Sequence, residues 1–130
     1  PDMARALGVW PELERLATQF LKAYRPETCQ IQLENVLLDL RVGLAETTLS
    51  DWAGKADAWF LDGFSPARNP ALWSAELMRQ VGCHTRPGGT FATYTSAGHV
   101  RRSLIAAGFE VRKIRGFGRK REMSVGTYPA

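Results

Sequence analysis

The residue best placed for chemistry in this 130-residue sequence is a carboxylate at the end of an apolar run. Residues 58–61 are all apolar, and Asp62 follows them directly, before Gly63 and Phe64 begin a turn. Such a run without polar alternation indicates a strand buried on both faces of a parallel sheet. Because ligands of open α/β sheets bind beyond the carboxyl ends of the strands, Asp62 is the first candidate site residue. The alternative is a turn aspartate that accepts a hydrogen bond from the following backbone.

The residues after Asp62 also have a superficial likeness to the G-x-S-x-G nucleophile elbow of hydrolases, with Ser65 as the nucleophile and His84 or His99 as its base. In that elbow the residue after the nucleophile donates its backbone N–H to the oxyanion. Pro66 occupies that position and has no N–H. The sequence therefore argues against an esterase, and Ser65 is interpreted as a turn residue.

Positive charge is concentrated near the C-terminus. Between positions 101 and 121 there are eight Lys or Arg and one acid, whereas the whole chain has a net charge of +4. Local positive charge of this kind is typical of a surface that binds a polyanion, and a solvated charged face is the alternative. The candidate phosphate-binding residues are Arg101, Arg102, Arg119, Lys120 and Arg121.

Three aromatic side chains could present a stacking face to a nucleic-acid base. Phe64 and Tyr94 lie just after predicted strands and are the better candidates. Trp73 is in helical register with Leu77, so it is interpreted as a core residue.

Composition excludes several classes of protein. Cys29 and Cys83 lie outside any C-x-x-C pattern, and the only histidines are His84 and His99, so the sequence predicts no metal site and buried or incidental thiols. No apolar stretch approaches the roughly 20 residues of a membrane span. No signal peptide opens the sequence, and we therefore expect a cytoplasmic protein.

The elements that would position these residues alternate along the chain. The pattern predicts a helix over 11–24, a hairpin over 31–42, a short helix over 48–53, strands over 57–62, 90–94, 109–114 and 122–128, a turn over 86–89, a helix after Pro70 and a helix capped by Ser96. This order indicates a doubly wound α/β sheet whose last strand, which lacks a crossover helix, returns antiparallel. No glycine-rich phosphate-binding turn follows a first strand, so we expect one incomplete domain over 1–130.

Three stretches together resemble one family: DAWFLDGFSPARNPALW from position 57, RPGGTFATYTSAGHVRRSLIAAGFEV from position 86, and GFGRKREM from position 116. In order and spacing they are similar to the methyltransferase domain of the bifunctional tRNA wobble-uridine modification enzymes. The resemblance implies a class I, Rossmann-like fold that binds S-adenosylmethionine, with the glycine-rich cofactor loop before Pro1. It also implies methyl transfer to the exocyclic amine of 5-aminomethyl-2-thiouridine in tRNA. FAD is implied only if a fused oxidoreductase domain lies outside this chain.

The resemblance also assigns roles. It implies cofactor contacts from Gly43, Glu46, Asp62, Gly63 and Phe64, and substrate contacts from Phe64, Tyr94 and the five cations named above. Asp62 would orient the acceptor amine, since a carboxylate is a weak base toward an ammonium group.

One departure from the family pattern concerns the cofactor. Leu44 replaces the usual aspartate after Gly43, which leaves Glu46 as a possible substitute. A non-catalytic RNA-binding fragment is the alternative function, and the isolated segment is expected to be inactive.

Overall fold

The computed structural model describes residues 2–27 and 29–130, and the chain divides into two compact units, 1–42 and 43–130. The first unit contains α1 (Asp2–Leu7), a 3-10 turn η1 (Pro11–Leu13), α2 (Glu14–Ala23), β1 (Gln30–Leu33) and β2 (Val36–Asp39). Pro11 opens the helical segment, where its missing N–H is not needed. The helix ends at Tyr24, which is extended before Pro26. The predicted helix over 11–24 is confirmed.

The predicted hairpin is also confirmed. Strands β1 and β2 pair antiparallel, with Ile31 opposite Leu38. The connecting turn uses Glu34 at a φ of +52°, and Glu34 also forms an ion pair with Arg15 of α2. A left-handed residue in a two-residue connection matches the twist of the two strands.

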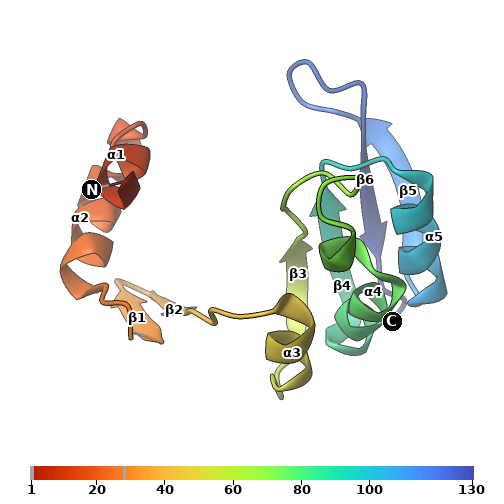
Figure 1. Ribbon diagram of the computed structural model, residues 1–130, viewed down its shortest axis with the longest axis horizontal. Helices are drawn as coiled ribbons and strands as arrows, with labels where there is room; N and C mark the ends of the chain where they lie inside the picture. Colours follow the sequence, from red (N-terminus) through yellow and green to blue (C-terminus); the bar gives the residue numbers. More distant parts are fainter. Residues whose placement is uncertain (1, 28) are drawn as a thin grey trace. The chain divides into compact units, whose positions relative to one another are not determined.

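The second unit is built on a four-stranded sheet of β3 (Ala56–Phe60), β4 (Thr85–Thr93), β6 (Glu122–Thr127) and β5 (Glu110–Arg115), in that spatial order. β3 and β4 are parallel, whereas β6 is antiparallel to both of its neighbours, β4 and β5. The prediction that the last strand returns antiparallel is therefore confirmed. In Figure 1 the arrowheads of β3, β4 and β5 point to one end of the sheet, and the β5–β6 connection rises from that end. We call this end the carboxyl edge.

The helical elements of this unit are α3 (Ala45–Ser50), a 3-10 turn η2 (Pro70–Trp73), α4 (Ala75–Cys83) and α5 (Gly98–Ala106). α4 begins at an N-cap, Ser74, whose hydroxyl accepts a hydrogen bond from the Leu77 N–H at 3.1 Å. The helices and strands enclose one hydrophobic core, which consists of Trp73, Leu77, Met78, Val81, Phe91, Val100, Leu104 and Phe109.

Four predictions differ from the structure. The strand before Asp62 is not buried on both faces, because β3 lies at the edge of the four-stranded sheet and both Ala58 and Phe60 are exposed. The predicted turn over 86–89 lies inside β4, where the register against β3 shifts between Ala56 and Ala58, because extra residues can bulge from a strand without ending it. The short helix starts at Ala45, earlier than predicted. Ser96 does not cap α5, whose N-cap is Ala97 without a side-chain hydrogen bond. Of the two alternatives for the cysteines, buried or incidental thiols, burial is excluded because Cys29 and Cys83 are both exposed.

Candidate functional site

Asp62 lies at the carboxyl edge, two residues beyond the end of β3, as predicted. Its side chain is exposed, and Oδ1 accepts a hydrogen bond from the Gly63 N–H at 2.7 Å. Gly63 has a φ of +156°, which side chains rarely tolerate, and a Cβ there would lie 2.3 Å from Cδ2 of Leu72. The turn alternative is therefore present in the structure, but it uses only Oδ1. Among the described residues Oδ2 accepts no hydrogen bond, and the side chain is exposed, so this oxygen is open to a ligand.

The turn that follows Asp62 is fixed to the core. The indole N–H of Trp73 donates to the carbonyl of Phe64 at 2.8 Å, and Trp73 itself is 5% exposed. The Ser65 carbonyl accepts from the backbone N–H groups of Arg68 and Asn69, which agrees with its interpretation as a turn residue. A buried anchor of this kind holds the exposed turn in one position.

The two candidate stacking residues are both exposed at the carboxyl edge. Phe64 is 72% exposed and follows β3, and Tyr94 is 54% exposed and follows β4, the parallel neighbour of β3. Trp73, by contrast, is buried in the core, as the sequence predicted.

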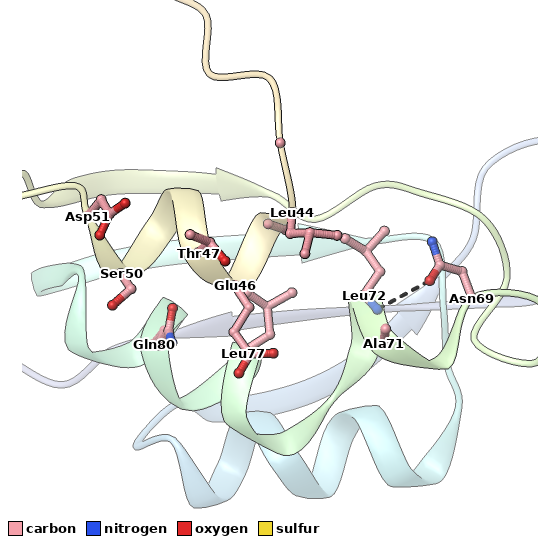
Figure 2. Close-up of a pocket in the computed structure, with 12 residues that line it drawn as sticks. Leu44, Glu46, Thr47, Ser50, Asp51, Asn69, Ala71, Leu72, Leu77 and Gln80 are labelled. Atoms are coloured by element: carbon pink, nitrogen blue, oxygen red, sulfur yellow. Dashed lines mark hydrogen bonds between the residues drawn. The ribbon is translucent and has the colours of Figure 1, made fainter.

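A cavity of about 600 Å³ lies beside α3, η2 and α4 (Figure 2). Gly43 and Glu46, two of the predicted cofactor residues, both line it, and so does Leu44. Asp62, Gly63 and Phe64 are not among its lining residues. Gly63 nevertheless approaches it closely, since the missing Cβ of Gly63 faces Leu72, which lines the cavity.

Sequence reasoning did not single out Leu72, Asn69 or Gln80, which also line this cavity. Asn69 Oδ1 accepts from the Leu72 N–H at 3.4 Å and so caps η2. An asparagine before a proline is a helix-start signal that could have found Asn69. Gln80 Oε1 is buried and has no hydrogen-bond partner in the part of the chain described, and no sequence signal reveals it.

The five predicted cations do not form one cluster. Lys120 and Arg121 line a cavity with Ser96 and Glu122, whereas Arg102 lines a different one, between α4 and α5, with Glu76 and Arg79. Arg101 and Arg102 are adjacent on α5 and therefore project about 100° apart around the helix. Arg119 is exposed in the β5–β6 connection.

The fold and the residues at the carboxyl edge define a class of protein. It is an α/β protein whose ligand site would lie where the parallel strands end, beside the carboxylate of Asp62 and the exposed rings of Phe64 and Tyr94. Comparison with known families is more specific. Residues 11–129 match the family described as S-adenosyl-L-methionine-dependent methyltransferase, and the chain belongs to that family.

Its relatives include two proteins named tRNA 5-methylaminomethyl-2-thiouridine biosynthesis bifunctional protein MnmC. The one from Ectopseudomonas mendocina is 46% identical over 134 residues, which are 99% of this chain and 20% of the relative. The one from Chromohalobacter salexigens is 48% identical over 133 residues, which are 98% of this chain and 19% of the relative. The chain thus spans about a fifth of the length of these curated relatives.

A solved structure agrees in fold. The crystal structure of MNMC2 from Aquifex aeolicus is 33% identical and superposes with a TM-score of 0.75, over 93% of this chain and 39% of that one. The predicted class I methyltransferase fold is confirmed.

The cavity beside α3 fits part of S-adenosylmethionine. The orphaned Gln80 Oε1 is an acceptor for an exocyclic amine such as that of adenine, and the exposed Leu44 together with Leu72 offers an apolar wall to a ring. Glu46 supplies a carboxylate in the same cavity where Leu44 replaces the family aspartate.

Over residues 2–27 and 29–130, no three His, Cys, Asp or Glu side chains gather as a metal site would require. Within the same residues, no helix is both long and apolar enough to cross a membrane.

Proposed function

We propose that this chain forms the acceptor side of a methyltransferase that modifies 5-aminomethyl-2-thiouridine at the wobble position of tRNA. The observation that carries the proposal is Asp62, an exposed carboxylate held on a fixed turn at the carboxyl edge of a methyltransferase sheet. The names of the relatives support the substrate. A tRNA substrate also implies a cytoplasmic protein. The word bifunctional in the names of the relatives is consistent with a second activity elsewhere in a longer chain. That activity would depend on FAD if it is the oxidoreductase that the resemblance implies.

S-adenosylmethionine, when bound, supplies the methyl group on a sulfonium. The chain would hold its adenine end with Gly43, Glu46 and Gln80, which line one cavity. Gly63 and Phe64 would border the cofactor on the side of Asp62.

The transfer is an in-line displacement at carbon, so the enzyme must place an unprotonated amine on the line of the breaking bond. Asp62 accepts one hydrogen bond from Gly63, and its other oxygen would accept one from the amine and orient the lone pair. A carboxylate is too weak a base to deprotonate an ammonium group, so the amine must bind in its neutral form. The proton that the methylated nitrogen carries after transfer is then lost to solvent.

The base must leave its stack to reach Asp62, since the anticodon nucleotides are stacked in the loop. Phe64 and Tyr94 are exposed just after β3 and β4, two adjacent parallel strands, and would stack on its faces. This arrangement favours an enzyme over a purely structural RNA-binding module, which would need no carboxylate here.

The test is Asp62→Asn in the full-length protein that carries this sequence, with methyl transfer to hypomodified tRNA as the measurement. A lost orienting group should lower the rate of transfer about 100-fold. Asp57→Asn is the matched control, because Asp57 lies near the start of β3, the strand that leads to Asp62, and pairs with Arg86 at 2.9 Å, away from the carboxyl edge. Equal rates for the two variants would contradict the role of Asp62.

The alternative, a non-catalytic RNA-binding module, makes a different prediction. Titration of the unmodified protein with S-adenosylmethionine should release or absorb heat at a one-to-one ratio. If the protein binds tRNA but shows no heat of binding with S-adenosylmethionine, the result would support the RNA-binding module and contradict the proposed methyltransferase.

A further inference from the structure

A second cavity, of about 460 Å³, lies at the same carboxyl edge as Asp62. Ser96, which follows β4, lines one part of it, and Lys120, Arg121 and Glu122, where the β5–β6 connection enters β6, line the rest. β4 and β6 are hydrogen-bonded neighbours in the sheet. The cavity is therefore built from two adjacent strand ends, and we call it the edge cavity.

The connection that carries the two cations has a defined conformation. The Gly116 N–H donates to the Arg121 carbonyl at 3.1 Å, and the Lys120 N–H donates to the Phe117 carbonyl at 3.1 Å. Gly118 has a φ of +61°, which closes the turn. A Cβ at Gly116 would lie 2.5 Å from the Lys120 carbonyl oxygen, so glycine at this position lets the two backbone segments approach.

The acid that lines the edge cavity is already neutralised. Lys113 Nζ donates to both carboxylate oxygens of Glu122, at 2.9 and 2.8 Å. This hydrogen bond lowers the pKa of Glu122, and the nearby charge of Arg101 lowers it further. Glu122 is therefore an ionised carboxylate paired with Lys113, and it forms no ion pair or hydrogen bond with Lys120 or Arg121 in the described residues.

Two cations that line the cavity lack an acceptor. Across the ranges that the structure describes, Lys120 and Arg121 form no ion pair and no side-chain hydrogen bond. Arg101 does not line the cavity, but its charge acts on Glu122, and its buried Nε has no hydrogen-bond partner in the described residues. A buried guanidinium N–H without a partner costs free energy, so such a group marks a place where an acceptor is expected. The hydroxyl of Ser96 adds a neutral donor.

The geometry points to a phosphate subsite: we propose that the edge cavity binds one backbone phosphate of the RNA, beside the nucleotide whose base reaches Asp62. This inference rests on the proposed function. Asp62 follows β3, and the cavity lies where β4 ends and β6 begins, so the two are offset across the sheet by one to two strand spacings, or about 5–10 Å in that direction. A phosphate next to the flipped nucleotide falls within that range.

Arg102 is left out of this subsite. Arg102 lines the cavity between α4 and α5. Its side chain lies against Gly98 at the start of α5, where Nη1 is 3.0 Å from the point that a Cβ would occupy if Gly98 had a side chain. The five cations that the sequence predicted as one phosphate-binding set are therefore divided, and the phosphate would contact Arg101, Lys120 and Arg121.

The first test compares two equivalent substitutions by fluorescence anisotropy with a tRNA anticodon stem-loop. Arg121→Ala should weaken binding about tenfold and reduce the slope of log affinity against log salt by about one, because one phosphate contact is lost. Arg112→Ala removes the same charge from an exposed position within β5, and should change affinity little. Equal losses in the two variants would show only non-specific electrostatics and would overturn the proposal.

The second test locates the phosphate. A series of stem-loops, each with one neutral methylphosphonate near the target uridine, should show one linkage whose replacement weakens binding to the unmodified protein about tenfold. The same replacement should have no further effect on Arg121→Ala, since the two changes remove one contact. If every linkage has the same effect on both proteins, the edge cavity holds no backbone phosphate.

Failure of this proposal can be separated from failure of the proposed function. If Arg121→Ala binds RNA and transfers methyl groups as the unmodified protein does, the subsite is wrong and the enzyme stands. If the unmodified protein transfers no methyl group to tRNA, the proposed function is wrong, whatever the edge cavity binds.

Discussion

The core of the second unit and its carboxyl edge differ sharply in how they are packed. Val100 and Leu104 on α5 are fully buried, and every residue of the hydrophobic core is at most 5% exposed. At the edge, Phe64 is 72% and Phe117 is 83% exposed, and Asp62 and the basic connection are exposed as well. Stability therefore comes from the strands and helices, whereas the candidate chemistry lies on turns that the core holds in place.

The largest expected effect separates these two regions by stability. Leu104→Ala leaves a cavity in the core and should lower the free energy of unfolding by about 2–5 kcal/mol, as measured by urea denaturation. Ile105→Ala is the matched control, because Ile105 is the next residue on the same helix and is 55% exposed. Its effect should stay within about 0.5 kcal/mol. Similar losses for the two would contradict the division into core and edge.

An intermediate effect is expected where the edge depends on backbone conformation. Gly63→Ala forces a side chain onto a φ of +156° and against Leu72, and should lower the free energy of unfolding by about 1–3 kcal/mol. It should also reduce methyl transfer, because the turn that holds Asp62 must shift.

Gly88→Ala is the control for Gly63→Ala, since Gly88 has a φ of +78° and nothing within 4 Å of its Cβ position. It should cost stability through the backbone alone and leave methyl transfer unchanged. Methyl transfer that survives in Gly63→Ala would show that Asp62 does not depend on this turn.

The smallest expected effect is electrostatic. Hydrogen bonds from Arg79 and then Gln80 lower the pKa of Glu76 from 4.5 to about 2. A pKa lowered by folding stabilises the folded state above pH 4.5, and this contribution is lost as the pH falls toward 2. The pair is solvent-exposed, so the effect is small. The difference in urea midpoint between the unmodified protein and Glu76→Gln should shrink over this range, and a constant difference would contradict the assignment.

Sequence reasoning was most successful where burial fixes the periodicity. The strands, the helices over 11–24 and after Pro70, and the antiparallel last strand follow from apolar patterns, and Trp73 was correctly placed in the core. Sequence reasoning failed where the same residue types are compatible with more than one local backbone structure. The Arg86–Gly89 segment carries turn residues, yet pairing with β3 keeps it in a strand as a bulge. Ser96 is a good N-cap by type, but the helix begins later, after Ala97.

The sequence by itself determined the order of the elements and the position of Asp62 just after a strand, because the pattern of apolar residues along the chain records which segments form strands and helices. The tertiary structure alone showed that this strand, β3, lies at the edge of the four-stranded sheet with Ala58 and Phe60 exposed. Only the tertiary structure decided which cations share a cavity, since Arg101 and Arg102 are neighbours in sequence but project in different directions. It also decided that Gly43, Glu46 and Gln80 line one cavity. Such contacts join residues far apart in sequence, and their distances are set by how helices pack on the sheet, which local periodicity does not record.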